Sequence, residues 1–455
     1  MSNIRVTYSG LISLAINLVS VLTGLGYIII ITRVLSTQEF GTWSMITSLM
    51  VYGAIFTSIP IFWLVRETAR EQKSEKTGLL SSIIWTPVGI LLYFLAVIAL
   101  SPEINIDITI LLFAVILVPI NNLQRLIATI NSGWKPQLTS YGMLVTEIIK
   151  VPLALLFVYY LDFGVIGVII SLFISQLSSI VFQIILARKR LQGNFEFSII
   201  KKWFKLSWVA LYPKISQMMY YSDVLIFSII IGSVEMIAYY AAALVLANVV
   251  SYAGEITKSV EPKLLGGGKR TIAIRNLTYS IYLAVPLLSL SIVFAEAGLV
   301  ILNPVYKTAT LVVVFLAFRM FFRSLGGTLE GYLRGIETVD IKENATTKDY
   351  IKSVFVTIPS FKIIQYSVYL LVLSIALISM VSSISKIELV IMWAGISMII
   401  HLPLLVYLLL KVRNTFETNY ELKSISKYIV AGFCSFGLLS FLIDKFLVVS
   451  EKLAE

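Results

Sequence analysis

The chain has little charge, one cysteine and one histidine, and each shortage excludes a class of protein. Only 13% of its 455 residues are charged, whereas soluble domains carry about 25%. The single cysteine, Cys434, excludes an intrachain disulfide framework and gives no metal cluster. The lone histidine, His401, lies in an apolar run, where a packed imidazole is the expected role and a ligand or proton carrier is the alternative. The sequence therefore predicts no metal and no cofactor.

Catalytic motifs are also missing. The chain has no Ser/His/Asp set, no glycine-rich phosphate loop and no metal-ligand spacing. Three glycines, Gly266 to Gly268, lack the flanking strand and helix of a nucleotide site and are expected to form a flexible loop. A membrane glycosyltransferase or polymerase would need large outer loops with carboxylates, but the only close acidic pair in one is Glu103 and Asp107. We therefore expect no enzyme and no catalytic residue.

Hydrophobic residues make up 58% of the chain and recur in long runs from end to end. A helix needs about 20 mostly apolar residues to cross a hydrocarbon layer about 30 Å thick. The first run is longer than a signal-peptide core, so we interpret it as a retained span. The pattern predicts spans over residues 8–31, 43–65, 79–100, 108–131, 138–160, 163–187, 207–231, 236–255, 273–295, 308–333, 357–381, 387–410 and 428–449.

The basic residues indicate an orientation. In the connections between the predicted spans, the outer side holds only Arg33, Lys307 and Lys386, and the other lysines and arginines lie on the opposite side. Because basic residues concentrate in cytoplasmic loops, the N-terminus is predicted to be cytoplasmic in a multi-pass protein of the cell membrane. The net charge of +11 is thereby explained without nucleic acid. The predicted cytoplasmic connections are 66–78, 132–137, 188–206, 256–272, 334–356 and 411–427.

One of these connections, residues 188–206, mixes aromatic residues with lysines. This composition predicts an amphipathic helix on the inner leaflet, with a solvated loop as the alternative. The connection follows six spans, where a joint between two halves is expected. The predicted organisation is an N-terminal six-helix lobe (1–187), this linker, a C-terminal six-helix lobe (207–410), and a cytoplasmic loop with an extra C-terminal helix (411–455).

Several short motifs occur in a fixed order along the chain. After the first span comes Arg33-Val-Leu-Ser-Thr-Gln-Glu-Phe-Gly-Thr-Trp43. The later motifs are Asp223-Val-Leu-Ile, the acidic turn at Glu235, Tyr239-Tyr-Ala-Ala-Ala243, Glu261-Pro-Lys and Leu302-Asn-Pro-Val-Tyr-Lys-Thr-Ala309. With these motifs, over roughly residues 8–410, the chain resembles the polysaccharide and oligosaccharide flippase family of the multidrug/oligosaccharidyl-lipid/polysaccharide (MOP) exporter superfamily.

The resemblance implies an all-α polytopic membrane protein with about 12–14 transmembrane helices in two six-helix lobes around a central cavity. It implies a flippase that carries an isoprenoid-phosphate or pyrophosphate-linked oligosaccharide from the inner to the outer leaflet by alternating access, for polysaccharide biosynthesis. The expected partners are this lipid-linked glycan, the bilayer and glycan-assembly proteins. Thirteen spans match neither twelve nor fourteen, the counts in that family.

Basic residues deep inside spans are expensive and are therefore functional candidates. Arg125, Lys362 and Lys445 are expected to reach the headgroups along their stems. The deeper cations are Arg319, Arg323, Lys150 and Lys214, and we predict that they bind the substrate phosphate, because guanidinium and ammonium groups pair with phosphate. Arg319 and Arg323 are four apart and share a helix face.

Acidic residues inside the spans allow two interpretations. Glu147, Asp223 and Glu255 are candidate sites for a coupling proton or sodium ion. Glu147 is also three residues before Lys150, so the two could neutralise each other on one helix. Asp223 could instead cap or orient its neighbours.

A multidrug or small-cation exporter of the same superfamily is the alternative function. Such an exporter usually needs an acidic cavity, and this chain has more deep basic than acidic groups. The charge balance therefore favours an anionic cargo over a cationic one.

Overall fold

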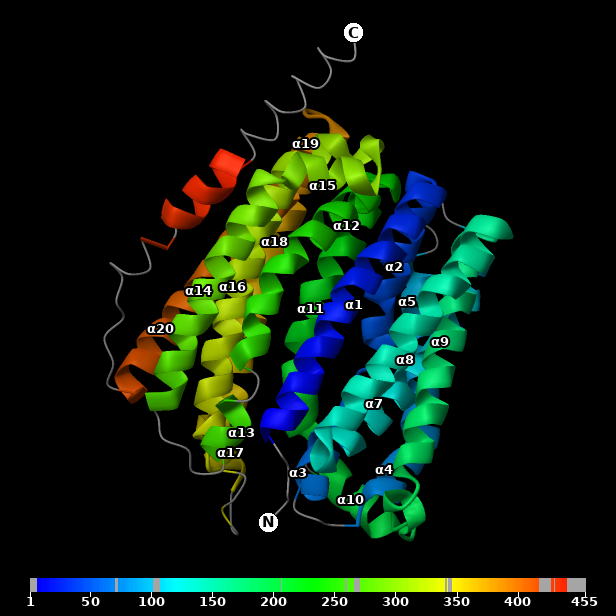
Figure 1. The fold of residues 1–455 in the computed structure, drawn as a ribbon, viewed down its shortest axis with the longest axis vertical. Helices are drawn as coiled ribbons and strands as arrows, with labels where there is room; N and C mark the ends of the chain where they lie inside the picture. Colours follow the sequence, from blue (N-terminus) through cyan, green and yellow to red (C-terminus); the bar gives the residue numbers. More distant parts are fainter. Residues whose placement is uncertain are drawn as a thin grey trace. The chain divides into compact units, whose positions relative to one another are not determined.

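A computed structural model of the chain describes residues 6–69, 73–100, 107–205, 207–257, 260–265, 271–339, 342, 346–416, 427–428 and 430–439. These residues form helices joined by short turns, with no strand among them. The chain divides into two compact units, Met1–Ala238 and Tyr239–Glu455 (Figure 1). The predicted lobes, with their linker and central cavity, remain a prediction.

The first unit contains fourteen helical elements and the start of a fifteenth. They are α1 (Val6–Val34), α2 (Thr37–Gly53), α3 (Ser58–Ala69), α4 (Glu75–Leu80), α5 (Ser82–Leu100), α6 (Ile108–Phe113), η1 (Ala114–Ile116), α7 (Leu117–Trp134), α8 (Pro136–Ala154), η2 (Leu155–Tyr160), α9 (Gly164–Ala187), η3 (Arg190–Gln192), α10 (Phe197–Lys205) and α11 (Ser207–Ile231), followed by α12 (Glu235–Ala247).

The second unit continues from within α12. Its helices are η4 (Asn248–Thr257), α13 (Val260–Leu265), α14 (Thr271–Val293), α15 (Ala295–Leu302), η5 (Pro304–Ala309), α16 (Thr310–Gly335), α17 (Thr347–Lys352), α18 (Val354–Met380), α19 (Lys386–Ile399) and α20 (Leu402–Phe416). A further short helix covers Val430–Leu439.

The all-α membrane fold is confirmed. Among the described residues, nine helices are long and apolar enough to cross a membrane, and they coincide with the third to sixth and the eighth to twelfth predicted spans. The first predicted span falls in α1, whose side chains are described only in part. The seventh is the continuous helix α11, which carries the polar residues Lys214, Gln217 and Asp223. The last begins in Val430–Leu439, and the residues after 439 lie outside the described part.

The second predicted span, 43–65, corresponds to two helices with a bend between them rather than to one continuous helix. It consists of α2 and the start of α3, which are bent by 65° at a break after Gly53. Pro60 lies in the first turn of α3. Proline favours a break before this position, because it has no backbone N–H and its ring clashes with the preceding turn.

The break leaves the carbonyl of Gly53 outside the regular helix pattern, and two other helices close around it. Asn122 of α7, fully buried, donates its side-chain amide to this carbonyl at 3.2 Å. Gly89 of α5 lies against the same oxygen, and a Cβ at this position would come within 2.1 Å of it. Glycine at 89 is therefore required for the close approach of α5 to α2.

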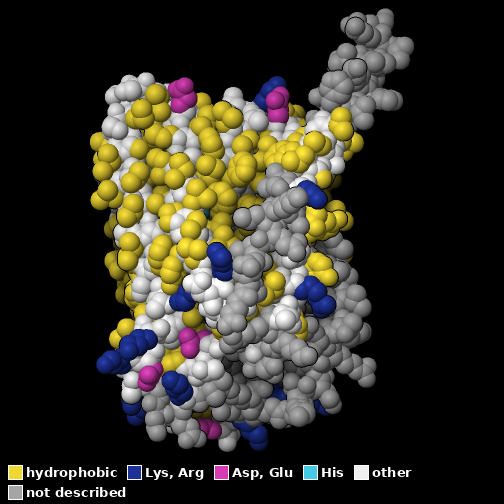
Figure 2. Space-filling model, turned by 90° about the vertical axis from the view of Figure 1, so that its left-hand side faces the viewer, with side chains coloured by type: hydrophobic (Ala, Val, Ile, Leu, Met, Phe, Trp, Pro, Cys, Tyr) yellow, Lys and Arg dark blue, Asp and Glu magenta, His cyan; other side chains and the backbone are white. Residues whose placement is uncertain are grey.

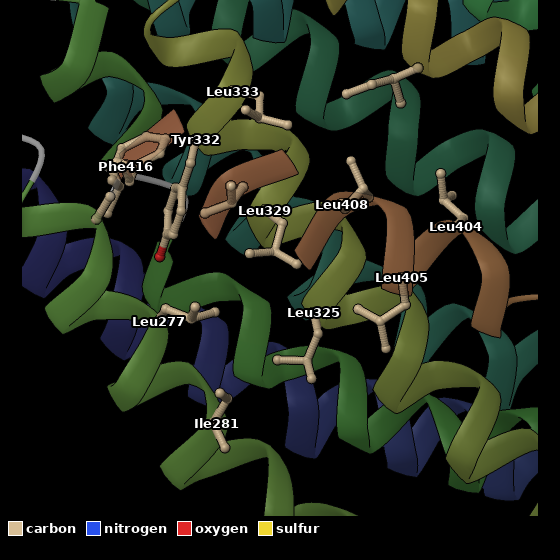
Figure 3. Close-up of a cluster of buried hydrophobic side chains, with 14 of the residues drawn as sticks. Leu277, Ile281, Leu325, Leu329, Tyr332, Leu333, Leu404, Leu405, Leu408 and Phe416 are labelled. Atoms are coloured by element: carbon tan, nitrogen blue, oxygen red, sulfur yellow. The ribbon is translucent and has the colours of Figure 1, made fainter. Parts of the chain in front are cut away.

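Each unit has its own hydrophobic core. In the first unit, α3, α5, α7, α9 and α10 meet at a cluster that includes Leu64, Trp85, Ile127, Ile180 and Trp203. In the second, Figure 3 shows side chains of α14, α16 and α20 packed against one another. The labelled members include Leu277, Ile281, Leu325, Leu329, Tyr332, Leu333, Leu404, Leu405, Leu408 and Phe416.

The surface agrees with a bilayer environment. On the face drawn in Figure 2, hydrophobic side chains cover a broad area, and Lys and Arg lie mainly below it. Helix α18 exposes Ile364, Leu371, Ile375 and Ile378 along its length, each at least 60% accessible. In water such a stripe would be unfavourable, but in a bilayer it faces lipid.

We expect Gly89→Ala to destabilise the protein. Its new methyl group cannot be accommodated without moving the Gly53 backbone, and overpacking of this kind costs about 1 to 3 kcal/mol. The measurement is the apparent Tm of the detergent-solubilised protein. The control is Gly327→Ala, which has open space within 4 Å of the new atom. Equal Tm values for the two variants would contradict the close contact.

Candidate functional site

The deepest predicted cation of the second unit, Arg319, donates hydrogen bonds to two hydroxyl groups. Its guanidinium is 1% exposed and donates to the hydroxyl of Tyr240 at 2.5 Å and to that of Ser397 at 3.4 Å. These contacts tie α16 to α12 and α19. The ring of Tyr240 stacks on that of Trp393, with centroids 3.6 Å apart. The arginine therefore belongs to a buried aromatic and hydroxyl-rich cluster.

His401 adjoins this cluster in the packed role expected from the sequence. Its Nδ1 lies 2.6 Å from the carbonyl oxygen of Ser397, and since a carbonyl can only accept, Nδ1 carries the proton. The rings of Tyr366 and His401 lie 5.9 Å apart between their centroids, at an angle of 60°. Ser397 is therefore shared, because its backbone carbonyl contacts His401 and its hydroxyl contacts Arg319.

Arg323 and Arg319 differ in environment although they are one turn apart. Arg323 is exposed, whereas Arg319 is buried. The next acidic residue along α16, Glu330, binds Lys362 of α18 at 2.5 Å and Arg334 at 3.3 Å. The sequence predicts that Lys362 reaches the headgroups, but in the structure it pairs with the carboxylate of Glu330.

In the first unit, Lys150 pairs with Glu147, the alternative that the sequence had left open. The ammonium lies 2.7 Å from one carboxylate oxygen, and Thr23 of α1 donates to the other at 2.7 Å. Lys150 also lies over the ring of Tyr27 at 5.1 Å from its centroid. The pair joins α8 to α1 and accounts for the charge of both residues.

The structure shows fewer contacts for the other two acidic candidates, Asp223 and Glu255. Asp223 is 3% exposed, and its carboxylate accepts the backbone N–H of Val224 at 2.8 Å. Its neighbour Ser222 makes a 2.8 Å hydrogen bond with Tyr52 of α2, so this part of α11 packs against α2. The side chain of Glu255 lies outside the described part of the chain.

The remaining predicted cation, Lys214, lies beside a second cation. Lys214 of α11 and Arg125 of α7 are within electrostatic range of each other, and Arg125 also interacts with Tyr221. Lys214 donates to the amide oxygen of Gln217 at 2.9 Å. Within the described residues, neither cation lies within salt-bridge distance of a carboxylate. This pair of like charges needs an anion or water to be favourable.

Sequence reasoning placed Arg125 at the headgroups and so missed the pair. Arg125 lies about two and a half turns before the end of α7 at Trp134, and Lys214 lies about two turns after the start of α11 at Ser207. Both helix ends border predicted cytoplasmic connections, so the two cations have matching depths. The sequence alone indicates that the two cations lie at similar depths, but it does not indicate that α7 and α11 bring them close together.

A comparison with protein-family models gives one match. A family described as polysaccharide biosynthesis protein matches residues 6–261, more than half of the chain. No curated protein sequence matches the chain significantly.

Solved structures with a similar fold are transporters. An inward-facing multidrug resistance MATE family transporter of the MOP superfamily superposes with a TM-score of 0.61 at 14% identity, covering 90% of this chain and 100% of the other. An outward-facing one gives 0.56 at 14% identity, covering 91% and 96%. A MOP superfamily transporter from Pyrococcus furiosus, described as having a binding pocket of reverse polarity, gives 0.54 at 14% identity, covering 91% and 96%.

We expect Lys150→Met to lower the apparent Tm, because it leaves the buried Glu147 without its counter-charge. Breaking a buried pair costs about 3 kcal/mol or more. The double variant Glu147→Gln with Lys150→Met should recover most of the loss, since it removes both charges. The control is Lys307→Met, which breaks the exposed Lys307–Glu296 pair and should leave the Tm unchanged. A fully stable Lys150→Met variant would leave Lys150 free for substrate.

Proposed function

Because this chain belongs to the polysaccharide biosynthesis protein family of the MOP transporter superfamily, we propose that it is a flippase for a lipid-linked oligosaccharide. The cargo is an isoprenoid-phosphate or pyrophosphate-linked glycan, carried from the inner to the outer leaflet by alternating access. The proposed location is the cell membrane with a cytoplasmic N-terminus, supported by the basic residues of the predicted inner connections.

The observation that carries the proposal is the like-charge pair Arg125 and Lys214. Two cations at one depth repel each other, and the repulsion grows as water is removed. A phosphate or pyrophosphate group between them would convert repulsion into two attractions, with the guanidinium forming a forked contact and the ammonium a point contact. Tyr221 and Gln217, next to the pair, supply groups that can bind sugar hydroxyls.

The second unit supplies further proposed cations. Arg323 is exposed on α16, one turn from the buried Arg319. We assign the phosphate contact to Arg323 and give Arg319 the task of holding α12, α16 and α19 together through Tyr240 and Ser397. Lys150 is assigned to its pair with Glu147. Coupling to a proton or sodium ion is proposed for Asp223 and Glu255, and glycan-assembly proteins are proposed partners.

A multidrug exporter is the second candidate function. Its support is the fold, because the similar structures include multidrug resistance transporters, and the fold alone does not separate the two cargoes. The charge of the proposed site supports an anionic cargo, because an organic cation placed beside Arg125 and Lys214 would meet like charge, which costs several kcal/mol at a binding site. We therefore favour the anionic cargo.

We expect cells depleted of this protein to accumulate lipid-linked glycan on the inner leaflet. Purified protein in proteoliposomes should move a lipid diphosphate oligosaccharide, and Arg125→Gln, Lys214→Gln and Arg323→Ala should each slow it at least about tenfold, the effect of losing a charged contact of about 1.4 kcal/mol or more. The readout is the rate at which labelled glycan becomes accessible to an external lectin.

The control is Lys348→Gln, which removes an exposed lysine of α17. It should transport at the wild-type rate, and all variants should keep wild-type Tm values. Wild-type transport by the Arg125 and Lys214 variants would refute the phosphate site. Transport of ethidium without transport of the glycolipid would establish the multidrug alternative instead.

A further inference from the structure

The linker helix α10 is fixed to the first unit by its polar contacts. Glu67 of α3 accepts hydrogen bonds from the indole of Trp203 and the ammonium of Lys202, both at 3.2 Å. Just before the helix, the backbone N–H of Glu196 donates to the hydroxyl of Thr77 at 3.0 Å. Trp203 itself is fully buried. The helix therefore has a defined inner side and a defined outer side.

Aromatic side chains adjoin the inner side but are left uncovered. At 100° per residue, Phe204 and Phe197 follow Trp203 and Ile200 around the helix. Phe204 is 63% exposed and Phe197 54%. Exposing two large aromatic rings on a nine-residue helix to water would be unfavourable.

Lysines occupy the next positions around the helix. Lys201 and Lys205 are both exposed and follow the two phenylalanines in angular order. The ammonium of Lys201 lies over the ring of Phe197 at 5.5 Å from its centroid. The order of buried residues, exposed aromatics and lysines is that of a helix lying in a membrane interface, with aromatic rings at the acyl boundary and ammonium groups among the headgroups.

One of the exposed rings contacts a membrane-spanning helix. Phe204 stacks on Trp85 of α5, with centroids 6.2 Å apart and an angle of 11°. Its neighbours Ile83 and Ile84 on the same span are exposed, Ile83 at 70%. Since the outer side of α5 faces lipid, the adjoining rings of α10 meet the edge of the same lipid phase.

From this geometry we propose that the outer side of α10, formed by Phe197, Lys201, Phe204 and Lys205, is a binding surface for anionic phospholipid headgroups. The rings enter the interface and the two lysines select negative lipids. Lipid fits better than a protein partner, because the surface is continuous with the lipid-facing side of a span and its charge complements an anionic leaflet. The surface does not depend on the nature of the transported cargo.

The test uses single-cysteine variants of the full chain in nanodiscs. Cys434, the one native cysteine, is replaced by serine. Phe204→Cys and Phe197→Cys are labelled with a fluorophore. The matched control is Ser198→Cys, which is exposed just beyond Lys205 around α10, about 100° or more from both rings. Brominated phospholipid should quench the probes at 197 and 204, whereas aqueous iodide should quench the probe at 198.

Lipid selectivity is measured at position 204. Brominated phosphatidylglycerol should quench the probe at least about twofold more than brominated phosphatidylcholine at equal mole fraction, and the change of Lys201 and Lys205 to Gln should bring the ratio to one. The control Lys386→Gln, an exposed lysine of α19, should leave the ratio unchanged. Quenching at 204 by iodide alone, or protection from both quenchers by a covering protein, would overturn the proposal, as would a ratio of one with both lysines present.

Discussion

The rest of the structure depends on one constraint, the need to satisfy every backbone N–H and C=O inside hydrocarbon. Continuous helices meet it by themselves, which is why the described chain is helical and why its turns are short. The end of α2 shows how the constraint is met where a helix stops. Where α2 ends at Gly53, the released carbonyl is taken up by the amide of Asn122, and α5 approaches closely because residue 89 has no side chain.

The same scarcity of water governs the charges, and the described spans treat them in three ways. Lys150 and Lys362 are neutralised by carboxylates on their own or a neighbouring helix. Arg319 is buried and donates hydrogen bonds to the hydroxyls of Tyr240 and Ser397. Arg125 and Lys214 have only each other among the described ionisable groups nearby, together with Tyr221. The last arrangement is the one that calls for an outside anion.

What could be predicted from the sequence was local. The spans follow from runs of apolar residues, and the Glu147–Lys150 pair follows from a spacing of three on one helix, since both need only the helix repeat. The partner of Lys362 could not be found this way, because Glu330 is 32 positions away and its proximity depends on how α16 packs against α18. The bend in the second span could not be predicted from a hydropathy window, because such a window counts Pro60 only by its apolarity and takes no account of its missing N–H.

The two sites proposed in the first unit rest on separate physics, although they are close in sequence. The like-charge pair needs α11 beside α7, and its binding energy comes from the attraction of two cations for one anionic group. The outer side of α10 needs only that Trp203 and Glu67 hold that helix in place, and its energy comes from apolar rings in an interface with two weakly screened ammonium groups. Removing Lys201 and Lys205 would thus leave Arg125 and Lys214 intact. Because α10 ends at Lys205 and α11 begins at Ser207, a leaflet-bound α10 would fix the end of the helix that carries Lys214 at a constant depth. Lys214 would then lie at the depth at which a phosphate group enters the protein from the inner leaflet.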